Sequence, residues 1–206
     1  MRSTKPASVL WLAAALSLAG CNNTTPSRIF AAVNWKMRCP NAEDIAGGCS
    51  MGCSEGPARG VNDFAGDNGV SLTCSVTETG SSRVLNFRAA TSTGQSITLQ
   101  NVTVPTGGGS ALSGTVRFRE DNDYTGLAGG NPPSAAQPCQ ISNVTFERDV
   151  DTTDTVIRGE VRCRQMRADA DNRICRGLTD PNGALVTATA VEFQVFACPG
   201  LVLAAP

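Results

Sequence analysis

Apolar and polar residues alternate along most of the chain after residue 28, with the period of two that is typical of half-buried β-strands. Val70 and Leu72, for example, alternate with Ser71 and Thr73. The segments with the clearest alternation are 70–77, 157–164 and 191–197. Weaker alternation covers 29–37, 84–89, 96–104, 112–119 and 139–148. The pattern therefore predicts about eight strands that each turn one face toward a core.

Short stretches rich in Gly, Pro, Asn and Ser separate these segments, as expected of turns. They lie at 80–81, 106–109, 129–133 and 181–183. No segment combines a helical period with capping residues. Short strands at this spacing predict an all-β fold, an antiparallel β-sandwich, with a β-barrel as the alternative.

The first twenty residues are organised differently, as an export signal. Arg2 and Lys5 supply positive charge, and the apolar stretch 9–18 follows them. This stretch is too short to span a membrane as a helix, but it has the length of a signal-peptide core. We expect residues 1–20 to be a signal peptide that is removed on export.

The four residues Leu18, Ala19, Gly20 and Cys21 resemble the lipobox of bacterial lipoproteins. The resemblance implies that diacylglycerol is attached to the Cys21 thiol, that the chain is cut before this residue, and that the new amino group receives a fatty acid such as palmitate. It also implies contact with the lipoprotein-processing and sorting machinery. Asn22 rather than Asp follows the cysteine, which in this family implies the outer membrane, on its periplasmic or cell-surface face. A plain secretory signal is the alternative.

Eight further cysteines remain in the mature chain: Cys39, Cys49, Cys53, Cys74, Cys139, Cys163, Cys175 and Cys198. In the oxidising compartment of an exported protein, an even number of cysteines indicates disulfides, here a disulfide-stapled fold. Three of them lie in 39–53 and five lie after it, so full pairing requires at least one bridge between the two groups. A Cys163–Cys175 bridge is one candidate. A zinc site is disfavoured because the chain has no CxxC motif and no histidine.

The chain beyond the signal peptide is expected to be one domain on a short tether. Residues 21–28 are polar and contain Pro26, which predicts a flexible, lipid-anchored tether. Residues 29–206 form the single β-sandwich domain, with a Cys-rich loop at 39–63. This loop has little periodicity and many small residues, so disulfides are expected to order it. It either connects two strands or presents a binding surface.

Charge and residue content exclude several classes of function. Removal of residues 1–20 leaves 15 basic and 18 acidic residues, a net charge of −3. This balance argues against a nucleic-acid partner, which requires a basic surface. The absence of histidine excludes Ser-His-Asp and Cys-His catalytic sites. No nucleophile elbow or phosphate-binding Gly-Lys motif is present. We therefore expect that the protein is not an enzyme.

Pairs of aspartates one residue apart are the best candidate metal ligands. They are Asp121 with Asp123, Asp149 with Asp151, and Asp169 with Asp171. The first pair resembles the start of a calcium loop, and calcium takes about six to eight oxygen ligands. The EF-hand pattern is not completed, because Pro132 stands where its glutamate is required. Asp and Asn are also favoured in turns. The sequence thus predicts no cofactor, with Ca²⁺ as the alternative.

Arg158, Arg162 and Arg164 alternate along 157–164 and predict an arginine-bearing outer strand face. We expect these side chains to pair with acidic neighbours across the sheet. Binding of an anionic ligand is the alternative.

The sequence favours a lipid-anchored envelope or surface β-domain with a structural or protein-interaction role. Its partner would be an unidentified envelope protein or glycan. A ligand-binding module for glycan or calcium is the second hypothesis, and an enzyme of unknown class is the third. Exposed aromatic side chains in one cluster would favour glycan, converging carboxylates would favour calcium, and a flat apolar patch would favour a protein partner.

Overall fold

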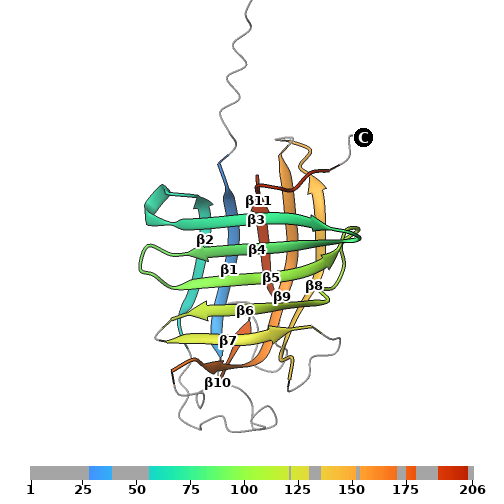
Figure 1. Cartoon of the computed structure of the whole chain (residues 1–206). Coiled ribbons are helices and arrows are strands. Elements are labelled where there is room, and N and C mark those ends of the chain that lie inside the picture. The colour runs from blue at the N-terminus through green and yellow to red at the C-terminus, as the bar shows by residue number, and fades with distance from the viewer. Residues whose placement is uncertain are drawn as a thin grey trace, which may run out of the picture.

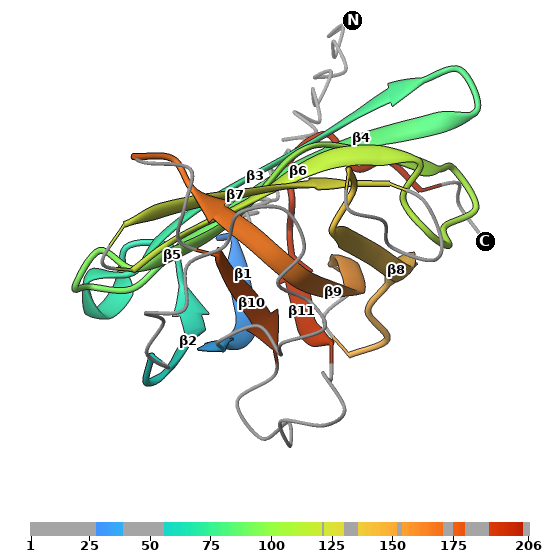
Figure 2. The ribbon, with the colours of Figure 1, turned by 90° about the horizontal axis from the view of Figure 1, so that it is seen from below.

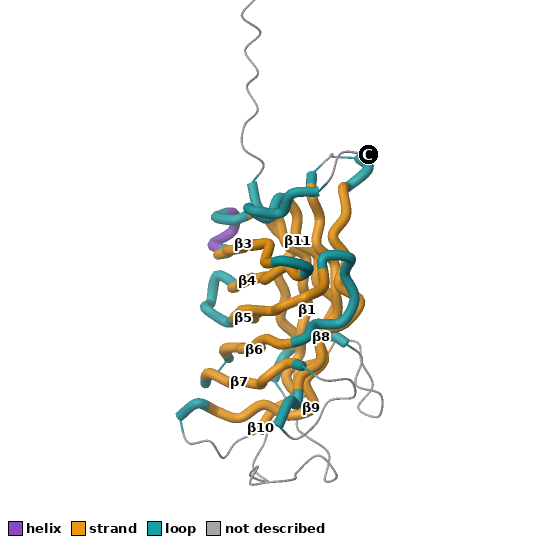
Figure 3. Tube along the Cα trace, turned by 45° about the vertical axis from the view of Figure 1, so that its right-hand side comes forward, coloured by secondary structure: helices purple, strands orange, loops and turns teal. Residues whose placement is uncertain are grey.

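The computed structural model describes residues 28–38, 56–120, 122–129, 136–151, 154–170, 175–179 and 190–203. Its strands are β1 (Phe30–Arg38), β2 (Ala58–Phe64), β3 (Ser71–Thr79), β4 (Ser82–Ala90), β5 (Ser96–Pro105), β6 (Ser113–Arg119), β7 (Asp123–Ala128), β8 (Cys139–Arg148), β9 (Thr155–Ala168), β10 (Cys175–Thr179) and β11 (Val191–Phe196). Within these ranges the helical structure is limited to one 3-10 turn, η2 (Asp67–Gly69). Strands dominate the trace (Figure 3). The prediction of an all-β fold is confirmed.

The strands form one continuous sheet, in the order β10-β1-β11-β9-β8-β7-β6-β5-β4-β3, with β2 paired to β1. The sheet folds back on itself, so that β3 to β7 make a front layer and the other strands make a back layer that crosses it (Figures 1 and 2). The neighbouring pairs are antiparallel except β7 with β8, which are parallel at Ala128 and Cys139. An additional pairing of β7 with β9 links the two layers. The result is a nearly closed, barrel-like mixed sheet, intermediate between the predicted sandwich and its barrel alternative.

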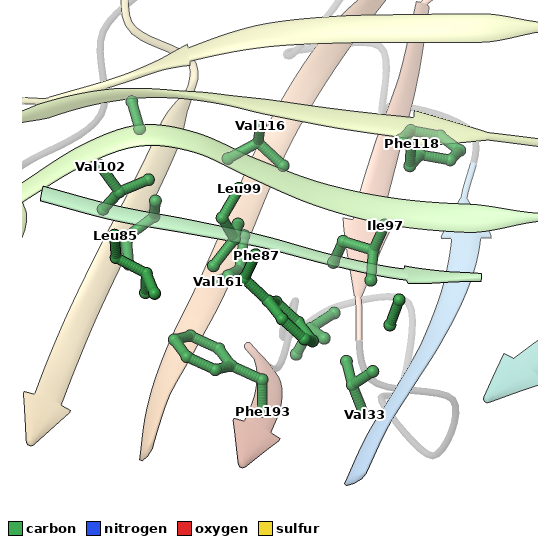
Figure 4. Packing of buried hydrophobic residues seen from close by; sticks show 14 of the residues in the cluster. Val33, Leu85, Phe87, Ile97, Leu99, Val102, Val116, Phe118, Val161 and Phe193 are labelled. Carbon is green, nitrogen blue, oxygen red and sulfur yellow. The ribbon is translucent and has the colours of Figure 1, made fainter. Parts of the chain in front are cut away.

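Apolar side chains from both layers fill the interior (Figure 4). Phe87 of β4 stacks on Phe193 of β11 across the layers, with ring centroids 6.2 Å apart. Within the front layer, Phe118 stacks on Tyr124 at 4.9 Å. Burying each large apolar side chain contributes about 1.5–3 kcal/mol. The apolar residues of the alternating segments therefore form the core, and their packing holds the two layers together.

All eight segments with period-two alternation are strands in the structure. The turn expected at 80–81 is also present, because Thr79 pairs with Ser82 and leaves only Gly80 and Ser81 to connect β3 to β4. Gly80 has a φ of 60°, a backbone conformation that glycine adopts without a steric penalty. The local sequence thus specifies both the strands and the turn of this hairpin.

Three strands were not predicted, namely β2, β7 and β10. The Cys-rich loop expected at 39–63 is wrong from Ala58 onward, because β2 pairs with β1 along its whole length. Only Val61 of β2 is buried, so its sequence shows no clear alternation. The remainder of that loop, 39–55, lies outside the described residues.

In the part of the chain that the structure describes, two disulfides cross-link the sheet. Cys139 bonds to Cys163, its direct partner in the β8–β9 register. The suggested Cys163–Cys175 bridge is therefore wrong. Cys74 of β3 bonds to Cys198, which follows β11, across 124 residues of sequence. This bridge ties the edge strand of the front layer to the segment that leaves the back layer.

The two bridges reduce the number of possible pairings among the other four cysteines. They use four of the five cysteines that follow residue 53 and leave Cys175. Cys39, Cys49, Cys53 and the side chain of Cys175 lie outside the described residues. If all eight cysteines pair, Cys175 must bond to one of the other three. Full pairing, four disulfides in all, stays a prediction.

Candidate functional site

A shallow polar groove of about 490 Å³ lies on the outer face of the front layer. It forms because the residues of β3 to β6 that point away from the core are polar, as the alternation requires. The outward-facing side chains that line it are Thr73, Ser75, Asn86, Arg88, Ser96, Thr98, Gln100, Arg117, Arg119, Asp123 and Asp169. Phe87 and Phe118 form part of its floor but are only 2% and 1% exposed. The groove is therefore polar and lacks an exposed aromatic ring.

One cross-strand row through the groove alternates threonine and arginine. The register places Arg88 beside Thr98, and Thr98 beside Arg117. The full row, from β3 to β9, is Thr73, Arg88, Thr98, Arg117, Thr125 and Arg167. Neighbouring strands are about 4.8 Å apart, so arginines on every second strand are separated by about 9.6 Å at the backbone.

The sign of the charge changes between the centre of the groove and its β7 edge. Among the described residues, neither Arg88 nor Arg117 has an ion pair or a side-chain hydrogen bond. At the β7 edge, Arg119 Nε lies 3.8 Å from Asp123 Oδ1, and Asp169 lines the same edge. The centre of the groove is therefore positive, and its β7 edge carries carboxylates.

A second candidate surface is an aromatic cluster at the end of the back layer where β1 begins, at the top of Figure 1. Phe30 of β1 packs edge-on against Phe64 of β2 and Phe196 of β11, with ring centroids 5.1 Å and 5.6 Å apart. Phe64 is 43% exposed. These rings line a small apolar depression of about 240 Å³, together with Arg28 and Asp154. We call Phe30, Phe64 and Phe196 the phenylalanine cluster.

A cation and an exposed valine accompany the phenylalanine cluster. The Arg28 guanidinium carbon lies 5.6 Å from the Phe64 ring centroid, and Nη2 lies 2.7 Å from Asp67 Oδ1. The hydrogen bond to Asp67 raises the pKa of Arg28 above its usual value, so this side chain stays charged. Val150, in the turn between β8 and β9 at the same end, is 94% exposed.

The aspartates proposed as metal ligands do not converge in the described structure. Asp123 begins β7 rather than a loop and pairs with Arg119. Asp149 Oδ2 lies 3.9 Å from Arg158, and its Oδ1 accepts a hydrogen bond from the backbone N–H of Asp151. Asp121 and Asp171 lie outside the described residues. Within the described ranges, no three Asp, Glu, Cys or His side chains are grouped to hold a metal ion.

The arginine face predicted on 157–164 is partly paired. Arg158 Nη1 lies 2.6 Å from Glu147 Oε2, across the β8–β9 pair. This agrees with the expected acidic neighbours for Arg158. Sequence reasoning did not identify the row through Arg88 and Arg117, because β4 and β6 each contribute a single arginine to it and the row exists only through the register.

Comparison of the chain with protein-family models, with curated proteins and with solved structures found no match. Among the described residues, no helix has the length and apolar character needed to cross a membrane. The features that bear on function are therefore the two surfaces and the N-terminal sequence.

Proposed function

We propose that the chain is a lipid-anchored envelope β-domain, held on the outer membrane by lipid on Cys21, with an interaction role rather than a catalytic one. The observation that supports it best is the position of the phenylalanine cluster. Arg28, beside this cluster, lies only seven residues after Cys21. Seven extended residues span at most about 25 Å. Lipid on Cys21 would therefore hold the phenylalanine cluster close to the bilayer.

The chemistry of this end suits a bilayer interface. Exposed Phe64 and Val150 can enter the boundary between headgroups and acyl chains, while Arg28 remains near the lipid phosphates. Each buried methylene of an acyl chain contributes about 0.8 kcal/mol, so the lipid carries the attachment. The phenylalanine cluster then sets the orientation of the domain. In this orientation the outer face of the front layer stays free for a partner (Figure 1).

A tryptophan placed in the cluster reports this orientation. In the lipidated protein incorporated into vesicles that contain brominated phospholipids, we expect Phe64→Trp fluorescence to be strongly quenched. Leu127→Trp is the matched control, because Leu127 is 53% exposed on β7 of the front layer. Its fluorescence is expected to be nearly unchanged by the bromine. The native Trp35 is fully buried and supplies a constant background in both variants.

Two readouts separate attachment from orientation. Flotation of the protein with the vesicles reports the lipid anchor. Equal quenching of the two tryptophans in floating protein would show that the phenylalanine cluster does not face the bilayer. Failure to float would contradict the anchor itself.

The second candidate function is ligand binding on the same domain. The polar groove favours a glycan over calcium, because it offers many hydrogen-bonding groups and the described carboxylates do not converge. Neutral glycans commonly stack on exposed aromatic rings, which this groove lacks, so the groove must recognise its ligand in another way.

A further inference from the structure

We propose that the groove on the front layer binds an extended acidic polysaccharide, with Arg88 and Arg117 each receiving the carboxylate of a uronic acid residue. The groove uses residues distinct from the phenylalanine cluster, and the inference does not require that Cys21 is lipidated.

The charge of the row is the first observation that supports this proposal. A guanidinium binds a carboxylate through two parallel N–H donors, which gives both strength and orientation. Arg88 and Arg117 lie in the centre of the groove, and no described residue occupies their donors. Arg88 is half-buried between Thr73 and Thr98 of the adjacent strands, so its stem is positioned before a ligand arrives. Two cations that have no partner among the described residues suit a ligand that carries at least two anions.

The spacing of the arginines in the row is the second supporting observation. Arg88 and Arg117 stand two strands apart, about 9.6 Å at the backbone. In an extended polysaccharide, consecutive sugars point to opposite sides, so carboxylates on one side recur once per disaccharide, over a comparable length. The row also continues through Thr125 to Arg167, in the same direction and with the same alternation. The periodicity of the sheet therefore matches that of a repeating acidic chain lying across the strands.

The other lining groups distinguish a sugar acid from other polyanions. Thr98, Asn86 and Gln100 offer donors and acceptors that suit sugar hydroxyls. Asp123 and Asp169 repel every anion, carboxylate or phosphate, but they accept hydrogen bonds from hydroxyls, which a sugar acid carries and polyphosphate lacks. A ligand that combines carboxylates with many hydroxyls uses all of these groups. Polyphosphate has no hydroxyls along its chain and would offer these two aspartates no hydrogen bond to offset the repulsion.

Binding of polygalacturonate to the full detergent-solubilised protein tests the inference. We expect saturable binding that weakens as salt rises, since Arg117 is exposed to solvent and Arg88 is only half-buried. Dextran, which has no charge, is expected not to bind. A galacturonate oligomer of three or more residues is expected to bind far more tightly than galacturonic acid, because only the oligomer reaches both arginines.

Two variants and one control locate the site. Arg88→Gln and Arg117→Gln are each expected to weaken binding about tenfold, the loss of one charge-assisted contact. Arg158→Gln removes the same charge from the back layer, where Arg158 pairs with Glu147, and is expected to leave affinity unchanged. Circular dichroism melting confirms that each variant is folded.

Several results would overturn the inference. One is the absence of polygalacturonate binding to the native protein. Another is an equal loss in all three variants, which would indicate diffuse attraction to net charge. Polyphosphate binding as tight as polygalacturonate binding would show a general anion site instead of a polysaccharide site.

Discussion

Replacing Cys74 and Cys198 together by alanine is expected to lower the free energy of unfolding by about 5 kcal/mol, the larger of the two disulfide effects. The bridge closes a loop of 124 residues, and the chain entropy that it removes from the unfolded state grows with loop length. Cys139 and Cys163 are only 24 residues apart, so the same double replacement there is expected to cost about 3–4 kcal/mol. Urea unfolding of both variants measures the difference.

The order of the two losses is the decisive result. Cys139 and Cys163 are fully buried and Cys74 is only partly buried, so an account based on lost packing alone predicts the opposite order. A larger loss for the Cys139–Cys163 pair would contradict the loop-length argument. The Cys74–Cys198 bridge also bears on the groove, because Thr73 and Ser75 flank Cys74 and line the groove edge. Its removal is therefore expected to weaken polygalacturonate binding as well.

Trp35→Ala is expected to destabilise the fold by about 4 kcal/mol, which is the usual cost of deleting a large buried ring. Trp35 lies in β1, which is hydrogen-bonded to β2 and β11, and its side chain has 0% exposure. The cavity left by alanine would lie between the two layers.

Trp35→Phe is the matched variant. The indole Nε1 is buried and has no hydrogen-bond partner among the described residues, so replacing it leaves none of their polar groups unsatisfied. Phenylalanine also keeps most of the apolar volume. We expect a loss of about 1 kcal/mol. Guanidinium unfolding curves of the two variants give both values, and equal losses would show that shape at this position matters more than volume.

The strands were predictable because period-two alternation is a local signal. Where the alternation failed to predict a strand, the cause is also local. In β7 the inward positions after Tyr124 are Gly126 and Ala128, two small residues that leave no hydrophobic signal. Gly126 is small for a structural reason, because a Cβ at this position would lie 2.5 Å from Cys139 Sγ. The Cys139–Cys163 disulfide therefore requires a small residue in β7, and this removes the hydrophobic signal that would predict the strand.

The groove could not be predicted, because register is a tertiary property. A shift of one residue turns every side chain of a strand to the other face, and irregularities between Leu85 and Phe87 and between Gln100 and Thr103 set the register here. At the second of these, Asn101 has a φ of 51°, and its N–H donates to Asn86 Oδ1. These irregularities help to bring Arg88 and Arg117 into one row.

The phenylalanine cluster was missed for a similar reason. Phe30, Phe64 and Phe196 are far apart in the sequence and meet only because β1 lies between β2 and β11. The resemblance to a lipobox, by contrast, rests on four consecutive residues, 18–21, and the sequence alone supplies the hypothesis that Cys21 is lipidated.

The intact mass of the native protein, extracted in detergent and alkylated with and without prior reduction, tests both the lipidation of Cys21 and the pairing of the other eight cysteines. We expect a chain that begins at Cys21 and carries two or three acyl chains, with no alkylation until reduction and eight alkylated cysteines after it. A chain without lipid would contradict the anchored domain. Free thiols in the unreduced protein would contradict the full set of disulfides.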